Sequence, residues 1–368
     1  MKNNKTSTFI VAIFSIILGL FIGGLILLFA GYNPIQAYTQ MIVGVFSKPK
    51  YISWMIVRAT PLIFTGLAVA FAFQTGLFNI GAEGQFIVGT IVAVLAGYLV
   101  ELPPIIHPIF VFTVAVIAAG LWGGIAGFLK ARFGIHEVIA TIMLNWIALY
   151  LRNYVVGLPR VQLKSNISHS IHPTASIMIG EGWKTTKAGQ TWAKAHPLLG
   201  EYLKAPANWG IIIAIVTVIV IWFILNKTTL GYQLRAVGSN QYAAEHAGIN
   251  VNRNIMMSMG ISGMLAGAAG ALHVMGVSKN ISTIAVMEGY GFDGIAVALI
   301  GSNTPIGSLL GGLLFGTLKY GGTKIQSPPV NAPSEVINIV IGIIVFFIAT
   351  PKLIKIIKDI YKRGEKNA

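Results

Sequence analysis

The sequence contains no cysteine, and charged residues are scarce. Without cysteine among its 368 residues, the chain can form no disulfide, thiolate-bound metal site, iron–sulfur cluster or cysteine nucleophile. Asp, Glu, Lys and Arg make up 10% of the chain, whereas soluble domains carry about 25%. So few charges cannot cover a water-soluble protein of this size. Long apolar stretches therefore indicate an all-α, polytopic membrane protein.

The sequence also lacks the short motifs of common catalytic and nucleotide-binding sites. It has no GxxxxGK[ST] phosphate loop, no HExxH zinc motif and no GxSxG nucleophile elbow. His169 and His172 are three residues apart, but Pro173 follows and no carboxylate is adjacent, which favours a solvated loop over a metal site. We expect no enzyme activity, no metal ion and no cofactor.

Negative charge is the scarcer of the two signs. The chain has 11 acidic and 26 basic residues, for a formal net charge of +15. Such an excess can indicate nucleic-acid binding, but here it is dispersed over loops and a basic tail. Membrane topology explains that distribution better, so we expect no nucleic-acid partner.

About ten apolar segments have the composition of transmembrane helices, and most approach the roughly 20 residues that a span needs. They cover residues 9–30, 58–74, 84–100, 108–129, 137–156, 209–226, 254–277, 289–302, 305–320 and 334–350. The first run is longer than the roughly 7–15 residues of a signal-peptide core, which indicates an uncleaved span. Segments 289–302 and 305–320 are short and interrupted by Gly or Pro, which fits either two tilted spans or a broken helix buried in protein.

Glycines at helical spacing predict close contacts between membrane helices. They form three sets: Gly120, Gly123, Gly124 and Gly127; Gly260, Gly263, Gly267 and Gly270; and Gly307, either Gly311 or Gly312, and Gly316. The stretch Gly123–Lys130 also resembles Gly312–Lys319. In a ten-span topology the two stretches end on opposite sides, as an inverted repeat of two five-helix halves requires.

The distribution of basic residues predicts that both termini are cytoplasmic, because Lys and Arg accumulate in cytoplasmic segments. We interpret residues 1–368 as a single transmembrane domain with three polar regions. These are an outer loop at 157–208, a cytoplasmic loop at 227–253 and a basic cytoplasmic tail at 351–368.

A polar cluster, Phe78-Asn-Ile-Gly-Ala-Glu-Gly-Gln85, lies between the second and third predicted spans. A carboxylate and two amides at the edge of an apolar segment need buried partners or a water-lined cavity. In one interpretation Asn79 caps the next helix and Glu83 complements the dipole of its first turn. In the other, the cluster takes a direct part in a translocation path. Both interpretations remain open from the sequence.

A second cluster runs from Gly231 to Ile249 on the predicted cytoplasmic side. Asn240 can cap a short helix that continues through Ala247, and Gly248 suits its C-terminal stop. A short capped helix with a smooth alanine flank suits docking into the groove of a partner. The alternative is a well-formed loop without a partner.

These segments resemble a known family of transport proteins. Gly231, Arg235-Ala-Val-Gly238, Asn240 and Ala243-Ala244-x-x-Ala247-Gly248-Ile249 are similar to the coupling loop of permease subunits of ATP-binding-cassette (ABC) importers, in the branch that serves sugars and nucleosides. Tyr242 stands where the wider signature Glu-Ala-Ala-x-x-x-Gly has its Glu. Asn79–Gln85 and Glu137–Asn145 resemble the nucleoside (guanosine-type) permeases in particular.

The resemblance implies a permease subunit in a bacterial plasma membrane that forms the path for nucleosides. It implies two separate ATPase subunits docked at the coupling loop, an extracellular substrate-binding lipoprotein, and a second, related permease in preference to a second copy. The residues that would couple to the ATPases are Arg235, Gly238, Asn240, Ala243, Ala244, Glu245 and Gly248.

A nucleoside path needs an apolar or aromatic slot and polar groups for the edges of the base. The residues that we predict along it are Phe71, Gln74, Asn79, Glu83, Gln85, Asn145, Trp146, Asp293 and Asn303. Alternatives are a permease of the same family for a simple, ribose-like sugar, and a secondary transporter driven by an ion gradient. Few carboxylates in the spans argue against the ion-driven transporter.

Overall fold

The computed structural model describes residues 17–349. The basic tail and the start of the first predicted span, residues 9–16, lie outside the described residues. The chain divides into two compact units, one formed by residues 49–316 and the other by residues 1–48 with 317–368.

Six long helices dominate the unit of residues 49–316. They are α3 (Pro49–Phe73), α4 (Ala82–Leu99), α5 (Ile106–Phe133), α6 (Glu137–Val156), α9 (Gly210–Lys227) and α12 (Val251–His273). All six are long and apolar enough to cross a membrane. They confirm the prediction of a polytopic helical membrane protein.

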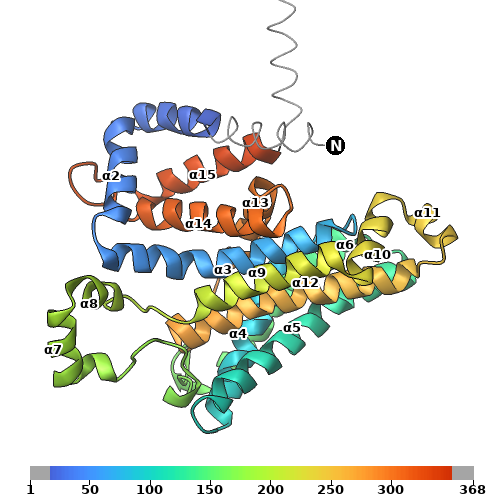
Figure 1. Cartoon of the computed structure of the whole chain (residues 1–368), viewed down its shortest axis with the longest axis horizontal. Helices are drawn as coiled ribbons and strands as arrows, with labels where there is room; N and C mark the ends of the chain where they lie inside the picture. Colours follow the sequence, from blue (N-terminus) through green and yellow to red (C-terminus); the bar gives the residue numbers. More distant parts are fainter. Residues whose placement is uncertain (1–16, 350–368) are drawn as a thin grey trace, which may run out of the picture. The chain divides into compact units, whose positions relative to one another are not determined.

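Shorter elements lie at two opposite ends of α12 (Figure 1). At one end are α10 (Thr229–Ser239) and α11 (Gln241–His246), which precede α12. At the other end are strands β1 (Gln162–Lys164) and β2 (Ile167–Ser168), the 3-10 turns η1 (Pro173–Ala175) and η2 (Trp183–Thr185), and helices α7 (Lys187–Ala195) and α8 (Pro197–Leu203). The chain therefore folds the predicted outer loop into a small structured cap.

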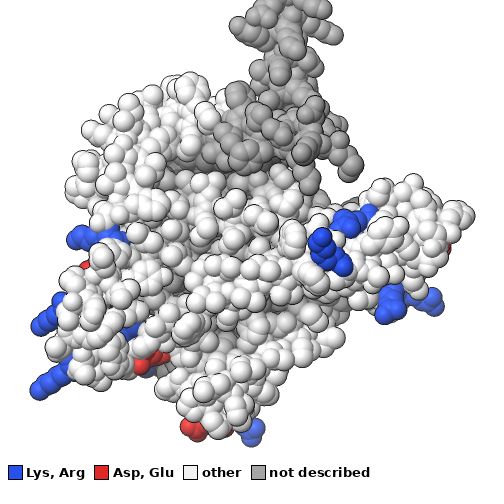
Figure 2. All heavy atoms as spheres, viewed as in Figure 1, with Lys and Arg blue, Asp and Glu red and all other residues white. Residues whose placement is uncertain are grey.

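Charge follows the same division. On the face shown in Figure 2, Lys and Arg side chains gather over the α7–α8 end and around α10 and α11, and the face of this unit between them carries none. Exposed large apolar side chains occur along α5, α6 and α9, including Leu121, Ile147 and Phe223. An uncharged apolar band between two charged ends is the surface that a lipid bilayer requires.

Glycines bring α4, α5 and α12 into direct backbone contact. A Cβ atom on Gly89 of α4 would lie 2.4 Å from the carbonyl oxygen of Gly267 in α12, and one on Gly123 of α5 would lie 2.6 Å from that of Met259. Such contacts exclude any side chain larger than hydrogen. Most members of the Gly120–Gly127 and Gly260–Gly270 sets make such close contacts, as predicted, but Gly124 and Gly260 do not.

The segment predicted as a span at 289–302 forms only a half-length helix. Helix α13 (Tyr290–Ile300) has 11 residues, about 16 Å of helix, against a hydrocarbon core of about 30 Å. It follows the π-helical turn η3 (Val274–Ser278), which ends α12, and an extended segment at 279–289. Helix α14 (Pro305–Gly322) then follows after a four-residue turn. Of the two predicted alternatives, the structure therefore has the broken helix packed within protein.

The extended segment starts at the end of the unit that holds the small cap. The backbone amides of Ser168 and Ile171 donate to the carbonyls of Ile281 and Lys279, at 2.9 Å each. Helix α13 then packs along α3, because a Cβ on Gly294 would meet Thr65 and one on Gly66 would meet Val297. The carbonyl of Asn303, just after α13, accepts a 2.8 Å hydrogen bond from Gln74 near α10. The segment and α13 together therefore run from the cap to the opposite end.

The other unit contains the helix Ile17–Phe29, α2 (Pro34–Phe46) and α15 (Ser334–Ala349). The first two helices are bent by 119° about a short break, where Gly31 has a φ of +85° and the Asn33 side chain caps α2. Gln40 donates to the carbonyl of Lys324 at 2.8 Å. The bend makes these two helices a broken span or a re-entrant loop. The proposed inverted repeat stays a prediction.

Adjacent glycines of α5 offer a matched test of the packing. We expect Gly123→Ala to destabilise the protein by about 1–3 kcal/mol, because the new methyl group overlaps the α12 backbone. Gly124→Ala should change stability by no more than about 1 kcal/mol, because a Cβ there meets nothing within 4 Å. Thermal unfolding of the detergent-solubilised protein measures both. Equal melting temperatures for the two variants would contradict the packing.

Candidate translocation site and coupling segment

Two of the resembling motifs lie against each other in the structure. The Asn145 side chain accepts from the amide of Gly84 at 2.8 Å and donates to the carbonyl of Ile80 at 3.0 Å. Glu137 accepts from the amide of Phe78 at 3.4 Å and pairs with Lys130 at 2.5 Å. Residues 59–65 positions apart thus form one polar contact between α6 and the start of α4.

Asn79 and Gln85 complete this contact on the α12 side. The Asn79 amide donates to Gln85 Oε1 at 2.9 Å and to Ser262 Oγ at 2.7 Å. All three side chains are buried. The prediction that Asn79 caps the next helix is wrong, because the N-cap of α4 is Gly81 and no side chain bonds there. The amide serves tertiary contact instead.

Glu83 caps a different helix from the one that carries it. Its carboxylate is fully buried and accepts from the backbone amides of Gly289 at 2.8 Å and Gly291 at 2.6 Å. These amides belong to the N-terminus of α13, where free N–H groups and the helix dipole favour a negative charge. Gly291 is required here, since a Cβ would lie 2.1 Å from the Glu83 nitrogen.

Two neighbouring residues of α6 hold the extended segment 279–289. Arg152, which is 4% exposed, donates to the Glu288 carboxylate at 2.5 Å and to the carbonyl of Ser282 at 3.0 Å. The Asn153 side chain exchanges two 2.9 Å hydrogen bonds with the backbone of Ile284. These contacts satisfy backbone groups that a helix would otherwise satisfy internally.

The other predicted path residues fall in different surroundings. Gln74 and Asn303 meet at the 2.8 Å bond between the Gln74 amide and the Asn303 carbonyl. Asp293 lies half-buried in the first turn of α13. Phe71 is fully buried in the core, and Trp146 is 46% exposed and stacks on Tyr150. The structure therefore gathers Asn79, Glu83, Gln85 and Asn145 and leaves Phe71 and Trp146 apart from that group.

Arg152 and Glu288 were missed by the sequence-based prediction. They are separated by 136 residues, and Glu288 precedes the apolar segment that was interpreted as a span. The position of Glu288 directly before an apolar segment was the available signal, because a carboxylate there needs a partner.

The predicted coupling segment is helical and capped as expected. Asn240 Oδ1 accepts from the amide of Ala243 at 3.1 Å and so begins α11. Gly248 has a φ of +80°, the left-handed conformation that ends many helices. Ala244 is buried, whereas Tyr242 and Glu245 are exposed. The Arg235 guanidinium donates to the carbonyl of Leu225 at the end of α9 and anchors α10.

Gly238 connects the coupling segment to the polar contact around α4. A Cβ on Gly238 would lie 2.3 Å from the carbonyl oxygen of Gln74 and 3.0 Å from the nitrogen of Gly76. Thr75 in the same turn donates to Ser258 of α12 at 2.9 Å. The turn leads directly to Asn79 and Glu83, so α10 packs on the start of the segment that caps α13.

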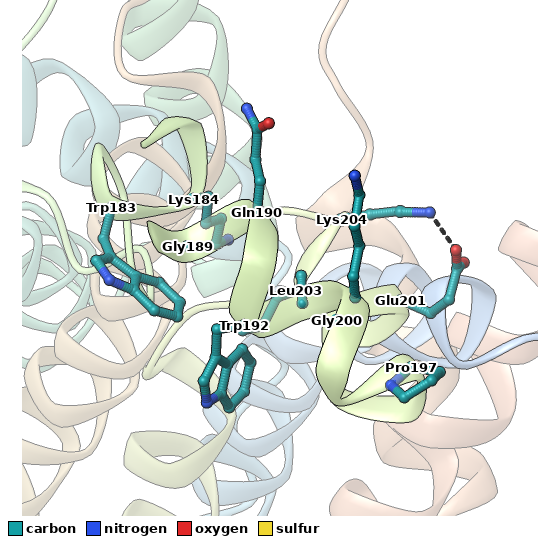
Figure 3. A pocket seen from close by; sticks show the side chains of 12 residues that line it. Trp183, Lys184, Gly189, Gln190, Trp192, Pro197, Gly200, Glu201, Leu203 and Lys204 are labelled. Atoms are coloured by element: carbon teal, nitrogen blue, oxygen red, sulfur yellow. Dashed lines mark hydrogen bonds and ion pairs between the residues drawn. The ribbon is translucent and has the colours of Figure 1, made fainter. Parts of the chain in front are cut away.

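A separate pocket of about 560 Å³ lies in the cap (Figure 3). All of its lining residues lie between Trp183 and Lys204, and none comes from α3–α6 or α12. Trp183 and Trp192 meet edge to face with ring centroids 5.4 Å apart, and burial lowers the pKa of the Lys184 ammonium. This pocket is distinct from the contacts around Glu83.

Comparison with known proteins assigns the family. Residues 51–349 match the model of a family described as the permease component of the branched-chain amino acid transport system. The chain belongs to this family of ABC permeases. It is a multi-pass membrane permease that works with ATPase and substrate-binding partners. No solved structure matches the permease.

Two relatives match the permease over its full length. The guanosine ABC transporter permease protein NupP of Bacillus subtilis is 41% identical over 99% of this chain and 99% of its own. The nucleoside ABC transporter permease protein NupB of Lactococcus lactis is 33% identical over 99% of this chain and 100% of its own. A third, the guanosine ABC transporter permease protein NupQ of Bacillus subtilis, is 27% identical over 71% of this chain and 78% of its own.

Removal of the Glu83 cap should reduce transport. Glu83→Ala leaves the amides of Gly289 and Gly291 buried without an acceptor, at about 1–3 kcal/mol each, and Asp293→Asn removes a charge from the first turn of α13. We expect at least about a tenfold loss of ATP-driven uptake in Glu83→Ala and a smaller loss in Asp293→Asn, with normal amounts of protein in the membrane. Glu101→Ala, on an exposed loop, is the control. Wild-type uptake in both test variants would exclude a role for these carboxylates.

Proposed function

We propose that this permease forms the membrane path of an ATP-driven nucleoside importer. The observation that carries the proposal is the full-length similarity to two permeases named for guanosine and nucleosides. The contacts between segments 79–85 and 137–145 support it, because the residues that resemble nucleoside permeases form one buried unit.

The permease itself binds no nucleotide as fuel in this proposal. Two separate ATPase subunits dock against the exposed side of α11, where Tyr242 and Glu245 point to solvent. Their movement reaches the turn at Gln74–Gly76 through Gly238. From that turn it reaches Glu83 and the N-terminus of α13. Residues Arg235, Asn240, Ala243, Ala244 and Gly248 shape the docking helix and hold it to α9.

The second permease subunit is a related protein rather than a second copy of this chain. Two Bacillus subtilis permeases, NupP and NupQ, both carry guanosine in their names, and this chain is more similar to NupP. An extracellular lipoprotein delivers the nucleoside at the cap. The permease lies in a bacterial plasma membrane with α10 and α11 on the cytoplasmic side and both termini cytoplasmic.

Uptake measurements test the substrate and the energy source together. Cells that lack this gene should lose most of their uptake of radiolabelled nucleosides and keep their uptake of ribose. Depletion of ATP in wild-type cells should abolish the nucleoside component, whereas collapse of the proton gradient at constant ATP should leave it intact. Loss of ribose uptake alone would indicate a sugar permease. Uptake that follows the proton gradient would indicate a secondary transporter.

The absence of cysteine allows a clean test of orientation and docking. Ala195→Cys in the exposed part of α7 should react with a membrane-impermeant maleimide added to intact cells. Glu245→Cys in α11 should react only after permeabilisation and should cross-link to an ATPase subunit through a short bifunctional reagent. The cysteine-free wild type is the control. The reverse labelling pattern would overturn the proposed orientation.

A further inference from the structure

Three aromatic rings from three helices meet beside the N-terminus of α13. The ring centroid of Tyr290 lies 4.8 Å from that of Phe86 in α4 and 5.2 Å from that of His273 in α12. The rings of Phe86 and His273 are 6.0 Å apart. Tyr290 directly follows Gly289, whose amide is held by Glu83. This aromatic cluster therefore sits at the break between the extended segment and α13.

Two members of the aromatic cluster, Tyr290 and His273, carry polar groups. Neither the Tyr290 hydroxyl nor the His273 ring nitrogens make a hydrogen bond within residues 17–349. Phe86 is fully buried, whereas Tyr290 and His273 both retain partial exposure. Their polar groups are therefore open to water or to a ligand.

A carboxylate with spare capacity lies beside the aromatic cluster. Glu288 gives one oxygen to Arg152 at 2.5 Å, and a quarter (25%) of its side chain remains exposed. Glu288 lies two residues before Tyr290 in the chain. A carboxylate has about four lone-pair sites, so Glu288 can accept further N–H donors without releasing Arg152.

We propose that this cluster is the binding site for the base of the transported nucleoside. The flat heterocycle stacks on the ring of Phe86, as aromatic systems do with centroids about 4.5–7 Å apart. Its polar edge bonds the Tyr290 hydroxyl, the His273 nitrogens and the free oxygen of Glu288. A base that presents N–H donors to the carboxylate suits this set best. The inference rests on the proposed nucleoside importer, and it adds that the aromatic cluster recognises the base of the nucleoside.

The location of the cluster links recognition to the coupling path. Glu288 and Tyr290 flank Gly289, and the Glu83 carboxylate binds the amides of Gly289 and Gly291. A shift of α4 relative to α13 therefore moves Phe86 and Tyr290, the two rings that stack most closely. Opening of that stack gives the base its place, and its closure expels the base.

Photolabelling of the assembled transporter in vesicles tests the proposal. With 8-azidoguanosine as the probe, we expect adducts in peptides that contain His273 or Tyr290. Tyr290→Phe and His273→Phe keep the rings and remove the polar groups, and each should lower the labelled fraction at least about fivefold, the effect of one lost hydrogen bond. Tyr154→Phe, on the exposed face of α6 at 68% exposure, should label as the wild type does.

Competition separates the base from the sugar. Excess guanosine should prevent labelling at the cluster, and excess ribose should not. Competition by ribose equal to that by guanosine, or adducts only in other peptides from vesicles that transport nucleosides, would overturn the base site and leave the proposed function intact. Vesicles of the wild type that transport no nucleoside would overturn the proposed function, and the base site with it.

Discussion

Two hydrogen bonds from the N-terminus of α13 to the Glu83 carboxylate fix the position of α13 against α4 in the unit of residues 49–316. A helix that begins inside the protein leaves amide groups without partners within its own helix. Glu83 supplies two acceptor oxygens at 2.8 and 2.6 Å. Burial of a carboxylate is costly, and the amides and the helix dipole offset that cost. The Glu83 carboxylate and the N-terminus of α13 therefore stabilise each other.

One continuous set of contacts joins the coupling segment to this bond. Gly238 of α10 lies against the turn at Gln74–Gly76, and the same turn leads into Asn79, whose amide bonds Gln85 and Ser262. Gly238 lets the backbones of α10 and the turn touch directly. The buried Asn79 amide forms short hydrogen bonds to its neighbours. Both contacts therefore leave little room for movement. In the proposed importer, a displacement of α10 would for that reason reach the start of α4 instead of being absorbed in loose packing.

Local patterns in the sequence were sufficient to predict the helices and the coupling segment. The apolar runs gave the six long helices, and Asn240 with Gly248 gave α11, because a cap and a stop involve only neighbouring residues. Arg152 and Glu288 could not be paired in advance, since 136 residues separate them. The half-length of α13 was one of the two alternatives that the short, interrupted segment 289–302 left open. Its apolar composition is that of a span, and only the contacts of segment 279–289 with α6 explain why the chain is extended there.

Contacts at both ends of the unit of residues 49–316 hold the extended segment and α13. Ser168 and Ile171 bond the segment on the cap side, Arg152 and Asn153 bond it from α6, and Gln74 bonds the carbonyl just after α13 on the coupling side. A continuous helix would resist bending in its middle, because each break loses backbone hydrogen bonds. This element has already exchanged those bonds for side-chain contacts, so its two halves can shift when the contacts at either end change. In the proposed importer, the break at Gly289 would connect movements of the cap with movements of α10.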